Sequence, residues 1–302
     1  MNQEFYSKLQ GIVSAEAILE NEPMSKHTTF RIGGNADLFV SPEISQVPQI
    51  MALVKEYQVP VTIIGNGSNL LVGDKGIRGL VISFGKGAEY VQVDGRCIIA
   101  GAGALLSKVA AEALKHSLTG FEFAAGIPGT LGGALVMNAG AYGGEIKDVL
   151  ISAKVLTTEG EVVELSAGEL DLSYRHSCIP KKEYIVLEAT IALEEGNEEA
   201  IREMMADFRG RRIDKQPLEY PSAGSTFKRP EGYFAGKLIQ DAQLRGYTVG
   251  GAQVSEKHCG FVINKGGATA ADVCKLIEDV KHIVYDKFQV ELEPEVKMIG
   301  EF

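Results

Sequence analysis

The chain has 302 residues, of which 45% are apolar and 23% charged, a composition typical of a globular protein with a sizeable core. Its 40 acidic and 30 basic residues give a net charge of -10, which disfavours nucleic acid or an anionic membrane as the partner. No apolar run reaches about 18 residues and the first ten residues lack a charged-then-apolar signal pattern, so we expect a cytoplasmic protein without a membrane span.

The four cysteines and five histidines are scattered, without the C-x-x-C or H-x-x-x-H spacing of a metal site. We therefore expect reduced thiols and no bound metal. Glycine is the unusual residue, because 35 of 302 is about 12%, against about 7% in an average protein. Since the chain has no repeats, so many glycines indicate turns at which the backbone must approach another group closely.

In chain order, the first half of the sequence predicts helices mixed with short strands. Apolar residues at helical spacing predict a helix over 43–57, and a buried strand follows over 59–65. Further short strands and then a second helix are expected at 79–84, 90–93, 97–101 and 105–117.

The turn GNGSN at 65–69 directly follows the first predicted strand. It has two glycines of a dinucleotide fingerprint but not the third, because that position is Leu70, so a Rossmann site is disfavoured. Successive N–H groups around the two glycines can still converge on an anion, and Ser68 and Asn69 add side-chain donors. A plain tight turn is the alternative interpretation.

A second glycine-rich segment covers 120–144 and holds eight glycines with a single charged residue. Its GIPGTLGG stretch (126–133) opens a predicted helix, whose free N–H groups and positive dipole end suit a phosphate. The following NAGAYGG stretch (138–144) leaves the backbone uncovered by side chains. Close packing of a helix on a strand is the alternative, but two such loops about sixty residues apart favour a large diphosphate cofactor.

The second half of the chain predicts a domain boundary near Pro217 and Pro221, which interrupt regular structure. Before the boundary we expect a hairpin, a strand and a polar helix, at 149–166, 185–194 and 197–212. Beyond it we expect a short helix, a strand, an amphipathic helix and a closing strand, at 235–242, 260–264, 269–288 and 291–300. The closing strand would carry Glu293 and Glu295 on one side. The pattern predicts an α+β fold, without a regular βαβ rhythm.

Three polar residues can each be interpreted either as ordinary surface residues or as catalytic residues. Ser225 lies outside a G-x-S-x-G motif and has no recognisable triad histidine, so a serine hydrolase is disfavoured. Surface turn chemistry for Ser225, a solvated side chain for Arg175 and an edge-strand salt bridge for Glu295 are the alternatives to a catalytic role.

Six motifs, in the same order along nearly the whole chain, resemble the UDP-N-acetylenolpyruvoylglucosamine reductase family. They are RIGG (31–34), IGNGSNLLV (64–72), GIPGTLGGALVMNAGAYGGEI (126–146), SYRHS (173–177), AGSTFKRP (223–230) and LEPEV (292–296). The resemblance implies a flavoenzyme that uses NADPH to reduce the enolpyruvyl ether of UDP-N-acetylglucosamine to UDP-N-acetylmuramate for peptidoglycan synthesis. In that family hydride comes from flavin N5. Because only about ten residues separate Arg175 from the next predicted strand, the chain resembles the shorter second type.

The resemblance also implies an architecture. It is an α+β fold with a two-part FAD-binding region of the vanillyl-alcohol-oxidase (PCMH) type and a C-terminal α+β substrate-binding domain. The expected FAD-binding subdomains are 1–75 and 76–210, the substrate-binding domain is 211–293, and a C-terminal strand over 294–302 returns to the first subdomain. We expect noncovalent FAD, NADPH as co-substrate, a nucleotide-sugar substrate and a monomer.

Residue roles follow from the same resemblance. Ser225 matches the family's proton donor, while Arg175 and Glu295 match its other catalytic residues. Cofactor contacts are expected from Gly65, Asn66, Gly67, Ser68, Asn69, Leu70, Gly126, Ile127, Pro128, Gly129, Gly132, Gly133, Asn138 and Gly140. Substrate contacts are expected from Tyr142, Lys215, Gly224 and Lys228.

Two other functions stay open from the sequence. An FAD-linked carbohydrate oxidase would share the cofactor fold and pass electrons to oxygen, which rapid aerobic turnover of a free sugar would reveal. A non-catalytic nucleotide-sugar sensor would keep the fold and bind UDP without flavin.

Overall fold

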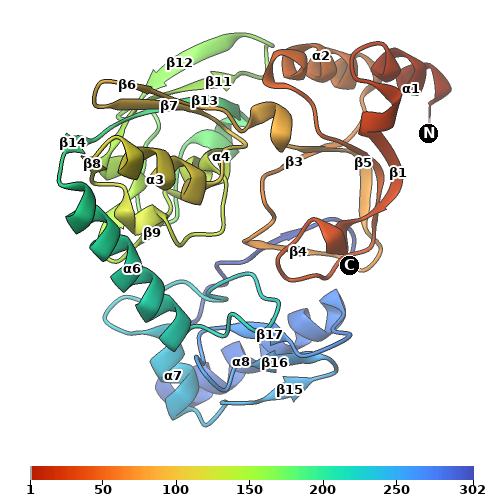
Figure 1. The fold of residues 1–302 in the computed structure, drawn as a ribbon. Helices are drawn as coiled ribbons and strands as arrows, with labels where there is room; N and C mark the ends of the chain where they lie inside the picture. The colour runs from red at the N-terminus through yellow and green to blue at the C-terminus, as the bar shows by residue number, and fades with distance from the viewer. Residues whose placement is uncertain (1) are drawn as a thin grey trace. The chain divides into compact units, whose positions relative to one another are not determined.

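The computed structural model describes residues 2–302, and Figure 1 labels their helices and strands. The chain divides into two compact units. Unit 1 comprises the residues up to Leu19, Leu38–Asn66 and Gly79–Arg211, and unit 2 comprises Glu20–Asp37, Gly67–Arg78 and Arg212–Phe302. Each unit has a hydrophobic core of its own. No helix within residues 2–302 is long and apolar enough to cross a membrane.

Four strands from the first third of the chain form one sheet in the order β1-β2-β5-β3. The strands are β1 (Ile18–Pro23), β2 (Asn35–Val40), β3 (Val61–Ile64) and β5 (Ile77–Ser83). Strands β3 and β5 are parallel, with Ile63 opposite Ile82. The GNGSN turn follows β3, as the sequence predicted.

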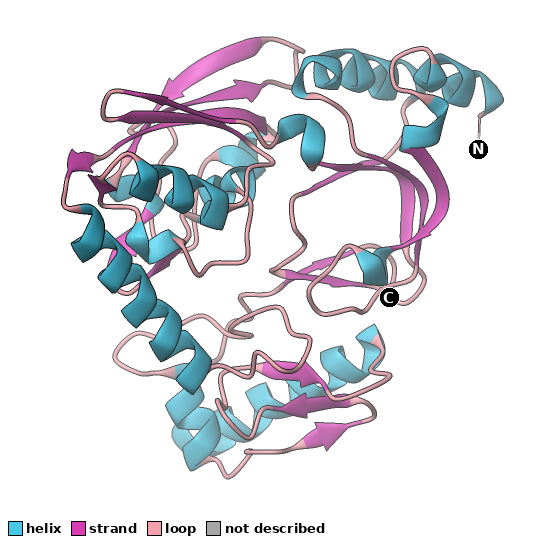
Figure 2. Ribbon diagram, in the orientation of Figure 1, coloured by secondary structure: helices cyan, strands magenta, loops and turns pink. Residues whose placement is uncertain are grey.

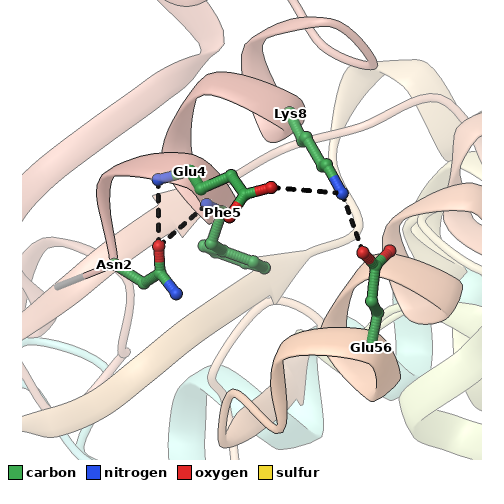
Figure 3. A network of polar contacts seen from close by, with 5 residues as sticks. All are labelled: Asn2, Glu4, Phe5, Lys8 and Glu56. Atoms are coloured by element: carbon green, nitrogen blue, oxygen red, sulfur yellow. Dashed lines mark hydrogen bonds and ion pairs between the residues drawn. The ribbon is translucent and has the colours of Figure 1, made fainter.

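Helix α1 (Gln3–Gln10) is capped at its start and held on helix α2 (Val47–Tyr57), as Figure 3 shows. Oδ1 of Asn2 accepts hydrogen bonds from the N–H groups of Glu4 (2.9 Å) and Phe5 (3.4 Å), two donors that a helix start otherwise leaves unpaired. Lys8 Nζ lies 2.7 Å from Glu56 Oε1 on α2. Because this ion pair is exposed, the burial of Phe5 contributes more to the contact than the charges do.

A five-stranded sheet in the order β12-β11-β13-β7-β6 organises the rest of unit 1. Its strands are β6 (Val91–Asp94), β7 (Cys97–Gly101), β11 (Leu150–Leu156), β12 (Val162–Ser166) and β13 (Ile185–Ala192). All neighbouring pairs are antiparallel, and the predicted hairpin is confirmed by the pairing of β11 with β12. Helices α3 (Leu106–Lys115) and α4 (Leu131–Met137) pack against this sheet, below its strands in Figure 2.

Unit 2 is built on a small antiparallel sheet covered by two helices. The sheet has the order β15-β16-β17, with β15 (Thr248–Val249), β16 (Ala252–Val254) and β17 (Val262–Asn264), and α7 (Ala235–Asp241) and α8 (Ala270–Phe288) complete it. The apolar stripe predicted for the last helix is confirmed, because its central residues are buried: Val273, Leu276, Ile277, Val280 and Val284. Strand β18 (Lys297–Ile299) is parallel to β4 (Leu70–Val72).

The remaining elements are short, apart from α6 (Glu198–Lys215). Two-residue strand pairs join β8 (Leu118–Thr119) to β14 (Glu194–Glu195) and β9 (Gly140–Ala141) to β10 (Gly144–Glu145). Single helical turns are α5 (Ile179–Lys182), η1 (Ala15–Ala17), η2 (Met24–Lys26), η3 (Ile44–Gln46), η4 (Lys86–Ala88), η5 (Glu122–Ala124) and η6 (Ile146–Asp148).

The closing strand is shorter than predicted. Only Lys297–Ile299 forms a strand, and the prediction of one strand over 291–300 is wrong. The preceding residues pair with 226–228 instead, because the Lys228 N–H donates to Glu293 O (2.8 Å) and Pro294 lies opposite Phe227. The Glu295 N–H still donates to Thr226 O (2.8 Å), and the chain changes partners only at Lys297, whose N–H donates to Asn69 O (2.9 Å). Both glutamates therefore lie beside the segment that carries Ser225.

The α+β class is confirmed by the mixture of helices with mainly antiparallel strands. The three-domain division stays a prediction. Unit 2 includes Glu20–Asp37 and Gly67–Arg78 as well as the C-terminal residues, so it is larger than the predicted substrate-binding domain. Its last segment begins at Arg212, beside the predicted boundary.

Candidate active site

The first two residues of the GNGSN turn, which belong to unit 1, meet the second glycine-rich loop there, although the two loops are far apart in the sequence. Asn66 Nδ2 donates a hydrogen bond to Pro128 O (2.7 Å). A Cβ added to Gly65 would lie 2.2 Å from Thr130 Oγ1, so a larger residue there would force the loops apart. The contact supports the interpretation of both loops as parts of one binding surface.

The GNGSN turn keeps its donors available. Across residues 2–302, the N–H groups of 65–69 have no hydrogen-bond acceptor, whereas the carbonyl of Gly67 accepts from the Thr29 N–H (3.3 Å). Gly67 has a φ of +61°, and a Cβ there would lie 2.1 Å from His27 O, so only glycine fits. Consecutive N–H groups without acceptors are the donor set that binds phosphate oxygens. These residues therefore fit the diphosphate of FAD.

The first turn of α4 is less open than predicted. The N–H groups of Leu131 and Gly132 donate to the carbonyls of Ala104 (2.8 Å) and Ala102 (2.9 Å). A Cβ on Gly132 would lie 2.9 Å from the Cβ of Ala102. The prediction that this helix offers free N–H groups to a phosphate is wrong, and buried Gly132 is a packing glycine. The close-packing alternative therefore holds at this position.

The other predicted cofactor residues of this loop lie outside that packing. Buried Thr130 caps α4, and its Oγ1 lies 3.5 Å from the N–H of Gly133, the one exposed residue among 130–134. The preceding segment 126–129 is half-buried or exposed and has no regular structure. These residues remain candidates for cofactor contacts.

Asn138 has a structural role that the sequence analysis missed. Its side chain is only 1% exposed, and all its polar atoms are used. Oδ1 accepts from the Lys147 N–H (2.9 Å), and Nδ2 donates to Glu145 Oε2 (2.8 Å) and Ser173 O (3.1 Å). Because its side chain has no donor or acceptor left over, a cofactor contact of Asn138 would have to use its backbone, and that contact stays a prediction. An asparagine directly after a predicted helix signals a cap but not these partners.

The segment that follows forms a tight hairpin between β9 and β10. Tyr142 and Gly143 have φ values of +54° and +93°, as the two central residues of a type I′ turn require. Gly140 permits the pairing, because a Cβ there would lie 2.6 Å from Gly144 O. The exposed Tyr142 ring stacks on Phe208 (4.3 Å between centroids) and its hydroxyl donates to Phe208 O (3.1 Å). The predicted substrate contact of Tyr142 would use the other ring face.

Arg175 lies in a four-residue turn of unit 1. Ser173 and His176 exchange backbone hydrogen bonds of 3.2 and 3.0 Å, and Arg175 has a φ of +56°. Its guanidinium carbon lies 4.9 Å from the centroid of the Tyr174 ring. Hydrogen bonding to Lys147 holds the pKa of Glu145 below its ordinary value, and the charge of Arg175 acts in the same direction. The turn thus presents a half-buried cation.

Ser225 and Glu295 lie on neighbouring segments of unit 2. Ser225 is exposed and directly precedes buried Thr226. The Thr226 N–H donates to Gly260 O (2.9 Å), its Oγ1 accepts from the Val262 N–H (2.9 Å), and its carbonyl accepts from the Glu295 N–H (2.8 Å). Ser225 therefore directly precedes a residue that is hydrogen-bonded to Gly260 and Val262 on one side and to half-buried Glu295 on the other.

Two bonds that the sequence did not indicate connect the GNGSN turn to these segments within unit 2. Thr29, whose N–H contacts Gly67, also donates from Oγ1 to Ser222 O (2.7 Å). Asn69 Nδ2 donates to Glu295 O (3.2 Å). The predicted cofactor turn is thus tied to the chain on either side of the predicted proton donor.

The other predicted substrate residues lie in unit 2. Lys228 forms an ion pair with Glu293, and Lys215 is exposed at the end of α6. Gly224 has a φ of +76°, and a Cβ there would meet open space. Strain, and not crowding, would therefore oppose a larger residue at 224.

Comparison with known proteins agrees with the cofactor surface. Residues 36–166 match an FAD binding domain family, and residues 216–299 match the UDP-N-acetylenolpyruvoylglucosamine reductase C-terminal domain. The chain is 60% identical over its whole length to the complete UDP-N-acetylenolpyruvoylglucosamine reductase of Agathobacter rectalis. It is 56% identical to that of Lachnoclostridium phytofermentans, covering 100% of this chain and 99% of the relative.

The chain belongs to the UDP-N-acetylenolpyruvoylglucosamine reductase family. The crystal structure of the Thermus caldophilus member superposes with a TM-score of 0.80 at 33% identity, over 93% of this chain and 97% of that one. Membership makes the protein an FAD-containing oxidoreductase. Full-length identity to the reductases also disfavours the carbohydrate oxidase.

Proposed function

We propose that this chain reduces the enolpyruvyl ether of UDP-N-acetylglucosamine to UDP-N-acetylmuramate with NADPH, and that Arg175, Ser225 and Glu295 carry the reaction. When bound, FAD supplies the hydride chemistry that connects NADPH to the enolpyruvyl double bond. The observation that supports the residue roles most is the connection of the GNGSN turn to the segments of Ser225 and Glu295.

Arg175 would hold the substrate carboxylate. Addition of hydride to the terminal vinyl carbon develops negative charge at the α-carbon and its carboxylate, and this charge needs donors already in place. A guanidinium is permanently charged and binds a carboxylate through two parallel hydrogen bonds. The left-handed backbone of Arg175 and the reciprocal bonds of its turn support such preorganisation.

Ser225 would transfer the proton from Oγ to the α-carbon, which completes the two-electron reduction of the double bond. A serine hydroxyl is a weak acid, so it can act only because the developing enolate is a strong base and the geometry is tight. The hydrogen bonds of Thr226 support this role, since they hold the segment on which the neighbouring Ser225 is exposed.

Glu295 would orient the reacting region. Its backbone is held by the Thr226 carbonyl and by Asn69, so its side chain starts from a defined place beside Ser225's segment. We further propose FAD contacts from 65–70, 126–129, Gly133 and Gly140, and substrate contacts from Tyr142, Lys215, Gly224 and Lys228.

Stopped-flow measurement of the two half-reactions tests these roles. Ser225→Ala should leave flavin reduction by NADPH nearly intact and slow flavin reoxidation by the enolpyruvyl substrate by about 10²–10⁴-fold. Ser107→Ala, on the exposed face of α3, is the control for loss of a hydroxyl. Equal losses in both half-reactions would contradict the role of Ser225. Recovery of the yellow colour with oxygen alone, and not with substrate, would contradict the function itself.

A cytoplasmic location is supported by the free state of all four cysteines. Size-exclusion chromatography with light scattering would test the expected monomer.

A further inference from the structure

The last turn of α4 lies against the turn that carries Arg175. Asn138 ends the helix with a φ of +42°, a conformation that a glycine would satisfy equally well. Capping therefore accounts for the backbone of Asn138 but not for its side chain, which makes three hydrogen bonds in a site where it is 1% exposed. One of those bonds goes to Ser173 O, at the base of the Arg175 turn.

A second bond holds the same turn from its other side. Ser177 is 3% exposed, and its Oγ donates to Val136 O (2.8 Å), also in the last turn of α4. The residues that flank Arg175 are thus both hydrogen-bonded to the end of one helix. Buried hydrogen bonds of this kind are costly to leave unmade, so they restrict where the turn can lie.

The start of α4 is held next to the glycine-rich loops. The N–H groups of Leu131 and Gly132 donate hydrogen bonds to the carbonyls of Ala104 and Ala102. Just before them, Pro128 accepts a hydrogen bond from Asn66, and Thr130 lies against Gly65. Seven helical residues at 1.5 Å each span about 10 Å. A short hydrogen-bonded helix is stiff, so α4 fixes the separation between the unit 1 residues of the cofactor loops, 65–66 and 126–129, and the Arg175 turn.

Asn138 also places a charge partner for Arg175. Its Nδ2 donates to Glu145 Oε2, and Glu145 forms an ion pair with Lys147 at 3.0 Å. The carboxylate is therefore oriented from two sides, and the charge of Arg175 helps to lower its pKa. Without the amide, Glu145 and the Ser173 carbonyl would both lose a buried donor.

We propose that Asn138 is a positioning residue for Arg175, and that it sets the guanidinium at a fixed separation from the FAD-binding residues of unit 1, 65–66 and 126–129, through Ser173, Glu145 and helix α4. The inference rests on the proposed catalytic role of Arg175. It assigns no contact between Asn138 and substrate or cofactor.

The test is Asn138→Gly, which removes the amide and keeps the left-handed backbone without strain. In the FAD-loaded enzyme, reoxidation by the enolpyruvyl substrate should slow by between about tenfold and a hundredfold, while FAD content and reduction by NADPH stay unchanged. Asn21→Gly is the matched control, because Asn21 is an exposed asparagine with a φ of +51°. An unchanged reoxidation rate in Asn138→Gly would overturn the proposal.

A double-mutant cycle separates positioning from general damage. In an Arg175→Lys background, Asn138→Gly should cause no further decrease in the rate of flavin reoxidation, since its effect is transmitted through the Arg175 guanidinium. Additive losses would overturn the proposal. If Arg175→Lys itself leaves reoxidation intact, the proposed function of Arg175 fails instead.

A readout independent of activity uses the protein without FAD. The ¹⁵Nε resonance of Arg175, assigned by its loss in Arg175→Lys, should shift in Asn138→Gly and stay in place in Asn21→Gly. If Asn138→Gly does not fold, Asn138→Asp keeps the acceptor for the Lys147 N–H and removes the donor to Ser173 O and Glu145, and the same cycle and resonance then test the proposal. Additivity with Arg175→Lys and an unmoved resonance would then refute the proposal.

Discussion

Replacing Asp74 by alanine should destabilise unit 2 by uncapping its longest helix. Asp74 Oδ1 accepts from the Ala270 N–H (2.7 Å) and Oδ2 from the Ala271 N–H (2.9 Å), although 196 residues separate Asp74 from Ala270. Within the helix itself, Thr269 and Asp272 form a reciprocal capping box. The start of α8 therefore depends on one distant carboxylate as well as on its own sequence.

The magnitude follows from the two bonds. A hydrogen bond to a charged acceptor contributes about 1.5–3 kcal/mol, and a carboxylate at a helix start adds about 0.3–1 kcal/mol. Because Asp74 is exposed, water can hydrogen-bond to the Ala270 and Ala271 N–H groups once the carboxylate is removed. The expected net loss in the free energy of unfolding is therefore about 2 kcal/mol. For a chain of 302 residues, whose unfolding entropy is about 0.6 kcal/mol/K, that lowers the melting temperature by about 3 °C.

Circular dichroism melts of the FAD-saturated protein, with hydrogen exchange over 270–288, measure the effect where it should occur. Asp74→Asn keeps a single carbonyl acceptor and should lie between Asp74→Ala and the parent. Asp94→Ala, at an exposed aspartate on β6, is the control. If Asp74→Ala melts with the parent and α8 exchanges at the parent rate, the distant cap contributes nothing and the argument is refuted.

Three further predictions concern other residues of unit 2. Thr29→Val removes the hydrogen bond to Ser222 O, so it should lower the stability by about 1 kcal/mol and slow flavin reoxidation by substrate more than flavin reduction by NADPH. Thr29→Ser keeps the hydroxyl and should restore both. Equal slowing of the two half-reactions would contradict the idea that this bond positions the segment of Ser222. Gly67→Ala should yield a colourless protein, because its Cβ would meet His27 O and strain the turn; a retained flavin spectrum would exclude this cradle. Hydrogen bonds from the Thr269 and Gly251 N–H groups lower the pKa of Asp272, so the stability that its carboxylate contributes is complete at neutral pH and is lost as the pH falls below about 4. In denaturant titrations between about pH 6 and 3, the free energy of unfolding of Asp272→Asn should therefore depend less on pH than that of the parent. Parallel pH profiles for the two proteins would contradict this role of Asp272.

The sequence by itself determined the elements with a strong local pattern. The apolar stripe of α8 and the β11–β12 hairpin appear where periodicity predicted them, because side-chain period alone decides which face of a helix or strand is buried. The motifs determined the family for a related reason. Other atoms lie so close to the Cα of Gly65 (Thr130 Oγ1) and of Gly67 (His27 O) that a side chain would collide with them, and this requirement is visible in the sequence as glycine.

Only the tertiary structure decided which distant groups satisfy the backbone and the buried polar side chains. Nothing near Leu131 indicates that Ala104 would occupy its N–H, and nothing near Asn138 names Ser173 as a partner. Residues 291–300 read as one strand, yet pairing with 226–228 and then with β4 divides them. The physical reason is that every buried donor and acceptor must find a partner, and that partner depends on which remote segments pack together.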